Sequence, residues 1–153
     1  MSDPIRIGFI GTGGNARGHI RTVAGLEGTG VVAFADPSEA ALGAAQERLD
    51  KPVPTYSDYI QMLDNEEMDG VIISTPHTLH YEQVMAALER GIHVEIEKPM
   101  ACTSAHAREI MAKQEETGLV VLIGYQRHYD QRFRWVRLKI AEGLIGRVTL
   151  THV

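Results

Sequence analysis

Lys98 stands between an acid and a proline, directly after an apolar run, in the stretch VEIEKPM at residues 94–100. Buried strands seldom end on two adjacent charges, and Pro99 has no N–H with which to continue strand pairing. An ammonium group held rigidly there could bind a hydroxyl oxygen and stabilise the alkoxide charge that develops during hydride removal. Taken alone, the stretch also fits a solvated lysine in a turn, so the surrounding motifs must decide.

A glycine-rich loop follows the first apolar run, in IGFIGTGGNARGH. Gly11, Gly13 and Ala16 form the pattern G-x-G-x-x-A, in which the first glycine permits a tight turn and the second lets the backbone approach a pyrophosphate. The small third residue keeps the next helix close to the sheet, so that its first amides face the phosphates. Cofactor contacts are therefore expected from Gly11, Thr12, Gly13, Gly14, Asn15 and Ala16.

Asp36 ends the next apolar run, about 20 residues after the glycine loop, which is the usual reach of the acid that binds ribose hydroxyls. The alternative role is a helix cap before Pro37, and the two roles can coexist. A carboxylate would repel a ribose 2′-phosphate, and no arginine stands beside it in ADPSEAA. The sequence therefore favours NAD over NADP.

The segment DGVIISTPHTLHYE supplies a further strand end with polar residues. Thr75 could bind a ribose or phosphate, and Pro76 stiffens the turn. His77 and His80 have a spacing that can bind a metal, but no cysteine or well-placed carboxylate completes a tetrahedral set, so no metal site is predicted. His80 is expected to bond the backbone or to help position the nicotinamide end of a cofactor.

Several of these runs are continuously apolar, as in strands that are covered on both faces. They alternate with helical segments, which predicts right-handed crossovers and an α/β fold with a doubly wound parallel sheet. Ligands then lie at the carboxyl ends of the strands, where all the residues above would meet. The expected strands are Ile5–Ile10, Val31–Ala35, a short run near Val53, Val71–Ser74, Val94–Ile96 and Val120–Ile123.

Helix boundaries are marked by caps. Thr103 can cap a helix that Gly118 ends, and Gly91 has the place of a left-handed cap after the helix that carries Val84. Pro37 suits the first turn of a helix that runs towards Leu49.

After Gly124 the chain becomes rich in aromatic and basic residues. This change predicts a Rossmann dinucleotide-binding domain at residues 1–124. Residues 125–153 are then expected to form a linker helix and the first strand of a truncated second α+β domain. The helix carries an apolar stripe of Phe133, Val136, Ile140 and Leu144. Arg147–Val153 alternates like a strand that has no successor, so it is expected to pair with another chain or with a segment outside this sequence.

Composition excludes several classes of protein. The 153 residues carry a formal net charge of −5, which disfavours nucleic-acid binding. The single cysteine allows no intrachain disulfide, and neither a signal peptide nor a membrane-spanning run is present, so a cytoplasmic protein is expected.

These motifs together resemble the Gfo/Idh/MocA oxidoreductases, the glucose–fructose oxidoreductase and inositol dehydrogenase family. The resemblance covers essentially the whole chain, and the glutamate-lysine-proline signature with the STP-x-x-x-H segment is more specific than the glycine loop. It implies a Rossmann domain followed by a larger domain whose open sheet backs the substrate site and often forms an oligomer interface. By resemblance, Lys98 is the catalytic lysine, and Glu97, Lys98 and Arg127 adjoin the cofactor.

The family's members usually oxidise or reduce hydroxyl groups of sugars and cyclitols with NAD or NADP, so the resemblance implies such a substrate, NAD as cofactor and a homo-oligomer. The family's general acid/base lies beyond residue 153, so the isolated chain is expected to be inactive. Two alternatives stay open. One is an NAD-dependent glycoside hydrolase of the same family, and the other is a non-catalytic nucleotide-binding module.

Overall fold

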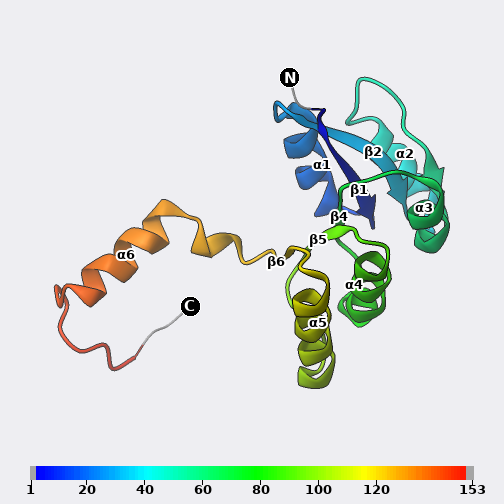
Figure 1. Ribbon diagram of the computed structural model, residues 1–153. Helices are drawn as coiled ribbons and strands as arrows, with labels where there is room; N and C mark the ends of the chain where they lie inside the picture. Colours follow the sequence, from blue (N-terminus) through cyan, green and yellow to red (C-terminus); the bar gives the residue numbers. More distant parts are fainter. Residues whose placement is uncertain (1–2, 151–153) are drawn as a thin grey trace.

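The computed structural model describes residues 3–150, in which six parallel strands form one sheet covered by helices (Figure 1). The strand order is β3-β2-β1-β4-β5-β6, which is the doubly wound arrangement with its change of direction between β1 and β4. This confirms the expected fold class. The strands are β1 Ile5–Ile10, β2 Thr29–Ala35, β3 Thr55–Tyr56, β4 Gly70–Ile73, β5 His93–Ile96 and β6 Val121–Ile123.

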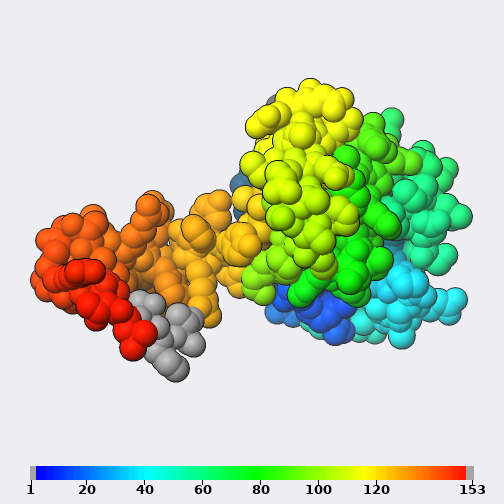
Figure 2. All heavy atoms as spheres, turned by 90° about the horizontal axis from the view of Figure 1, so that it is seen from below, coloured from blue at the N-terminus to red at the C-terminus, as the bar shows by residue number. Residues whose placement is uncertain are grey.

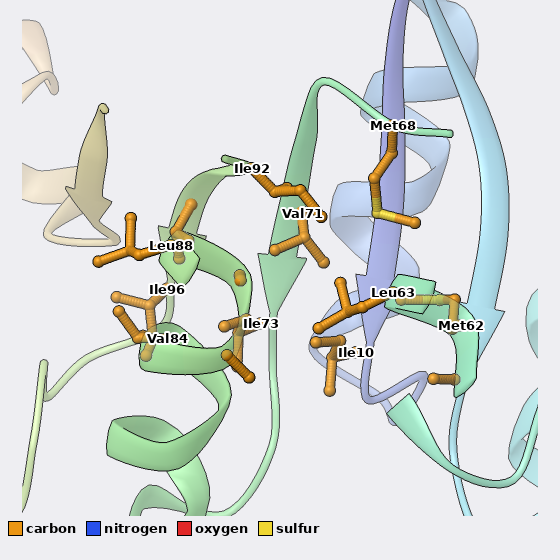
Figure 3. Packing of buried hydrophobic residues seen from close by; sticks show 14 of the residues in the cluster. Ile10, Met62, Leu63, Met68, Val71, Ile73, Val84, Leu88, Ile92 and Ile96 are labelled. Atoms are coloured by element: carbon orange, nitrogen blue, oxygen red, sulfur yellow. The ribbon is translucent and has the colours of Figure 1, made fainter. Parts of the chain in front are cut away.

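Both faces of the sheet are buried, because neighbouring residues of the central strands enter different cores. Phe9 and Phe34 meet edge to face, with ring centroids 5.9 Å apart, in the core beneath α1 (Ala16–Gly25) and α2 (Glu39–Gln46). On the opposite face, residues such as Ile10 and Ile73 pack against α3 (Tyr59–Asn65), α4 (His80–Glu89) and α5 (Ser104–Thr117), as Figure 3 shows for part of the cluster. This double coverage explains the continuous apolar runs of the sequence.

The caps fix most helix ends as expected. The Thr103 hydroxyl accepts a hydrogen bond from the His106 N–H at 3.2 Å, so α5 begins at Ser104. Gly118 ends α5 in the left-handed region, at φ 69°, and Gly91 takes a similar φ of 75° just after α4. Positive φ is strained for residues with a Cβ, which is why glycine stands at both ends.

Two local expectations need correction in their exact positions. Pro37 lies before α2 and not in its first turn, because the Ser38 hydroxyl accepts the Ala41 N–H and makes Ser38 the cap. The helix ends at Gln46, short of Leu49. The third strand was expected near Val53 and lies slightly further on, at Thr55–Tyr56, because its pairing with Phe34 and Ala35 of β2 sets its position.

The segment after β6 stands apart from the sheet (Figures 1 and 2). It contains η2 (Gln126–His128) and α6 (Gln131–Ala141), and the apolar stripe of Phe133, Val136, Ile140 and Leu144 is exposed. Residues 147–150 form no strand in this chain, and the rest of the expected strand lies outside the described residues. Within residues 3–150, no helix is long and apolar enough to cross a membrane.

Candidate functional site

The carboxyl ends of the strands meet at one edge of the sheet, and a cavity of about 370 Å³ opens there. Parallel strands necessarily bring these ends together, so residues that are distant in the sequence share one rim. Five of the predicted site residues line the cavity. Its lining consists of Ile10, Gly11, Gly13, Ala35, Asp36, Pro37, Ser57, Tyr59, Ser74, Thr75, Pro76, Leu79 and Gln83.

The glycine loop turns sharply out of β1 and against the end of β4. Gly11 has a φ of 84°, and a Cβ built on it would lie 2.4 Å from the Ser74 carbonyl oxygen, so no side chain fits there. A Cβ on Gly13 would meet nothing within 4 Å, and this residue is exposed on the open side of the loop. Ala16 is fully buried at the start of α1. The loop therefore has the close inner turn and the open outer backbone that a pyrophosphate requires.

Asp36 binds the glycine loop from the end of β2. Its Oδ2 accepts hydrogen bonds from the Thr12 N–H at 2.8 Å and the Thr12 hydroxyl at 3.1 Å, while its Oδ1 accepts the Ser38 N–H at 2.9 Å. Thr12 is the fully buried residue of the loop. A carboxylate oxygen accepts more than one hydrogen bond, so Oδ1 keeps the capacity to accept a ribose hydroxyl.

Glu97 joins the end of β5 to the start of α1. Its Oε1 accepts the Asn15 amide at 2.7 Å and lies 3.2 Å from Nε2 of His19, and its side chain is only 16% exposed. The His19 Nδ1 is 3.9 Å from Glu95 Oε1. The glutamate of the glutamate-lysine-proline signature thus fixes the far side of the glycine loop.

Lys98 leaves the sheet directly after Glu97 and is exposed. Its backbone N–H donates to Glu97 Oε2 at 3.3 Å, and the Lys98–Pro99 peptide bond is cis. In the part of the chain that the structure describes, its ammonium group has no hydrogen-bond or ion-pair partner. The group is therefore available to a ligand at the rim.

The end of β4 holds the remaining predicted residues. The Thr75 hydroxyl donates to Gln83 Oε1 at 2.6 Å, while Pro76 and His77 are exposed. His80 is fully buried, with Nδ1 2.7 Å from the Pro99 carbonyl oxygen and Nε2 3.1 Å from the Thr75 carbonyl oxygen. Of the two roles expected for His80, these contacts are those of a residue that bonds the backbone, because each ring nitrogen lies beside a backbone carbonyl oxygen.

Nine of the predicted site residues do not line the cavity, and seven of them are placed above. Of the other two, Gly14 is exposed within the glycine loop, where a Cβ would lie 3.7 Å from an Arg17 guanidinium nitrogen. Arg127 belongs to η2, and its guanidinium carbon lies 5.4 Å from the centre of the Phe133 ring. This contact lies within the segment after β6, and Arg127 is not part of the cavity lining.

Eight residues that line the cavity were not among the predicted site residues, namely Ile10, Ala35, Pro37, Ser57, Tyr59, Ser74, Leu79 and Gln83. Ser57 and Tyr59 follow β3, and placing that strand correctly at Thr55–Tyr56 would have put them at the rim. Burial raises the pKa of the Tyr59 phenol above its ordinary 10, and nearby Glu82 and Asp58 raise it further. Gln83 carries no local signal, because only the packing of α4 buries it beside Thr75.

The His77 and His80 rings meet edge to face, with centroids 5.5 Å apart. Across residues 3–150, no three His, Cys, Asp or Glu side chains are grouped so that they could hold a metal ion.

Comparison with known proteins identifies a family and several relatives that this chain resembles. Residues 5–125 match the model of an oxidoreductase family with an NAD-binding Rossmann fold, GFO_IDH_MocA. The chain is 32% identical over 150 residues to the uncharacterized oxidoreductase YdgJ of Escherichia coli, covering 97% of this chain and 42% of that protein. It is 30% identical over 153 residues to an inositol 2-dehydrogenase of Salmonella typhimurium, covering 97% of this chain and 45% of that protein.

A solved structure has the same fold over this part of its chain. Myo-inositol dehydrogenase from Lactobacillus casei, crystallised with NAD(H) and myo-inositol, superposes with a TM-score of 0.84 at 31% identity, over 94% of this chain and 43% of that one. The chain spans less than half the length of these relatives.

Proposed function

Because the chain belongs to the Gfo/Idh/MocA oxidoreductase family, whose NAD-binding Rossmann domain it contains, we propose that it binds NAD and serves hydride transfer to or from a hydroxyl-bearing carbon of a sugar or cyclitol. The observation that carries the proposal is the convergence of the glycine loop, Asp36 and Lys98 at one edge of the sheet, where hydrogen bonds connect the strand ends. The inositol dehydrogenases among the relatives support this substrate class.

In this proposal the chain's residues divide the work by position. The open backbone at Gly13 and the first turn of α1 hold the pyrophosphate, and Asp36 Oδ1 accepts a ribose hydroxyl. When bound, NAD supplies the hydride acceptor. Lys98 then holds the substrate oxygen and stabilises its negative charge as the hydride leaves the carbon.

The preference for NAD over NADP belongs to the same proposal. The Asp36 carboxylate faces the cavity, and a 2′-phosphate beside it would be repelled. In the cavity lining, Asp36 has no cationic neighbour that could offset this repulsion.

Residues 125–153 are proposed to begin a second domain that completes the substrate pocket and carries the proton-transfer group. The separation of α6 from the sheet and its exposed apolar stripe support this division. By family resemblance, the complete protein is proposed to be a homo-oligomer, and the single cysteine of these 153 residues supports the proposal of a cytoplasmic location.

Calorimetric titration of the 153-residue chain with NAD tests the binding step. The reaction requires the complete protein, assayed for NADH formation with inositols and free sugars. NADH release identifies a dehydrogenase, whereas cleavage of a glycoside without net NADH release would identify the hydrolase alternative. Absence of NAD binding would overturn the proposal.

A further inference from the structure

His80 connects two strand ends that meet at the proposed reaction centre. Its side chain is fully buried at the start of α4, and each ring nitrogen faces a carbonyl oxygen, Pro99 at 2.7 Å and Thr75 at 3.1 Å. Carbonyl oxygens only accept hydrogen bonds, so the ring must donate. The shorter contact places a proton on Nδ1, which faces Pro99.

The Pro99 contact bears on Lys98 because few bonds hold this turn. In the described residues, the hydrogen bonds of residues 98 and 99 involve two side chains, Glu97 and His80. The Glu97 bond is long, at 3.3 Å, whereas the His80 bond is short and lies in the interior. Pro99 has no N–H that could provide another. The buried ring therefore provides the stronger of the two side-chain hydrogen bonds that hold this turn to the body of the domain.

We propose that His80 is a positioning residue for Lys98. By donating from Nδ1 to the Pro99 carbonyl, it fixes the direction in which the backbone carries Lys98 away from the sheet edge, and its buried ring keeps that turn close to the Thr75 end of β4. The kinetic consequence rests on the proposed function, because the direction of Lys98 matters only when hydride transfer takes place beside it. The structural consequence does not depend on it.

Two amide variants separate the two contacts. In His80→Asn, the side-chain amide nitrogen can stand near the place of Nδ1, and in His80→Gln it can stand near the place of Nε2. Heteronuclear NMR of the 153-residue chain should show the Lys98 and Met100 backbone amides near their wild-type positions in His80→Asn and displaced in His80→Gln. His93→Gln, at the amino end of the same strand β5, sets the size of the shifts expected from losing a histidine elsewhere. Equal spectra around Lys98 in the two His80 variants would overturn the proposal.

The complete protein provides a second readout. His80→Gln should lower kcat about a hundredfold, the loss typical of a misplaced catalytic group, with little change in KM for NAD. His80→Asn should keep most of the wild-type kcat. A rise in KM with unchanged kcat would show a cofactor role in place of positioning and would overturn the proposal. If the wild-type protein neither binds NAD nor turns over, the proposed function fails, while the NMR comparison still decides the role of His80.

Discussion

The Asp36 carboxylate accepts the backbone N–H of Thr12 at 2.8 Å and the Thr12 hydroxyl at 3.1 Å, so one acid both shapes the glycine loop and faces the nucleotide cavity. The bond crosses from the end of β2 to the loop after β1. Removing the carboxylate should therefore affect both the shape of the loop and the choice of cofactor.

Asp36→Ala is expected to lower NAD affinity about tenfold or more, because a charge-assisted hydrogen bond to the loop and one to the ribose are lost. NADP affinity should fall less, since the repulsion of its phosphate is also removed, and the preference for NAD should narrow. Calorimetric titration of the wild-type chain and of Asp36→Ala with both cofactors measures these affinities. Equal NAD and NADP affinities in the wild-type chain would contradict the role given to Asp36.

Ser38→Ala is the matched control for that variant. It removes the cap of α2, two residues from Asp36, and should cost about 1 kcal/mol of unfolding free energy. The ratio of NAD to NADP affinity should stay unchanged. A narrowed ratio in Ser38→Ala would mean that the α2 cap, and not the carboxylate, determines cofactor preference.

Lys98→Ala in the complete protein should reduce turnover a hundredfold or more, on the order of 3 kcal/mol of transition-state stabilisation. NAD affinity should change much less, because the pyrophosphate and ribose contacts come from Gly13 and Asp36. Steady-state kinetics and a cofactor titration measure the two effects separately. Lys51→Ala, an exposed lysine in the loop before β3, is the control and should leave turnover unaffected. Near-normal turnover in Lys98→Ala would make Lys98 a solvated turn residue.

The bond between Asn15 and Glu97 should contribute to NAD binding by holding the glycine loop. Asn15→Ala and Glu97→Ala are each expected to weaken NAD binding, and the double variant should be weakened by less than the sum. A coupling energy of about 1 kcal/mol is expected for such a bond. Titration of the three variants completes the cycle, and strict additivity would show that the bond has no part in binding.

The Arg6–Asp69 pair should make stability depend on pH in the acid range. Hydrogen bonds from the Arg6 guanidinium and N–H lower the pKa of the Asp69 carboxyl from 3.8 to about 2. A carboxyl whose pKa is lower in the folded state stabilises the fold above its unfolded pKa, and this stabilisation is lost as pH falls from about 4 to about 2. Urea unfolding should show wild type and Asp69→Asn differing at pH 7 and converging towards pH 2. A difference that stays constant across this range would contradict the assignment.

The segment that begins at Arg147 is still predicted to pair outside this chain. Its alternating Val148 and Leu150 are exposed here, at 41% and 87%, and form no strand. Hydrogen exchange should therefore be fast at both amides in the 153-residue chain and slow in the complete protein, where a partner strand is present. Fast exchange in both proteins would refute the pairing.

The sequence alone determined the fold class and the principal motif positions, because these depend on local patterns. Continuous apolar runs such as Val71–Ile73 require coverage on both faces, and Thr103 and Gly118 mark helix ends through their own hydrogen bonds and φ angles. The glycine loop could also be predicted from local sequence, because the sharp turn after β1 requires a positive φ that favours glycine at Gly11.

Only the tertiary structure decided which site residues contact one another, because contacts between distant residues produce no regular spacing pattern in the sequence. β3 gained its place at Thr55–Tyr56 from pairing with β2, which brought Tyr59 to the cavity. Gln83 and His80 reach Thr75 and Pro99 because α4 packs against the end of the sheet. The bond from Glu97 to Asn15 spans 82 residues, and only the parallel order of the strands places these two side chains at one edge.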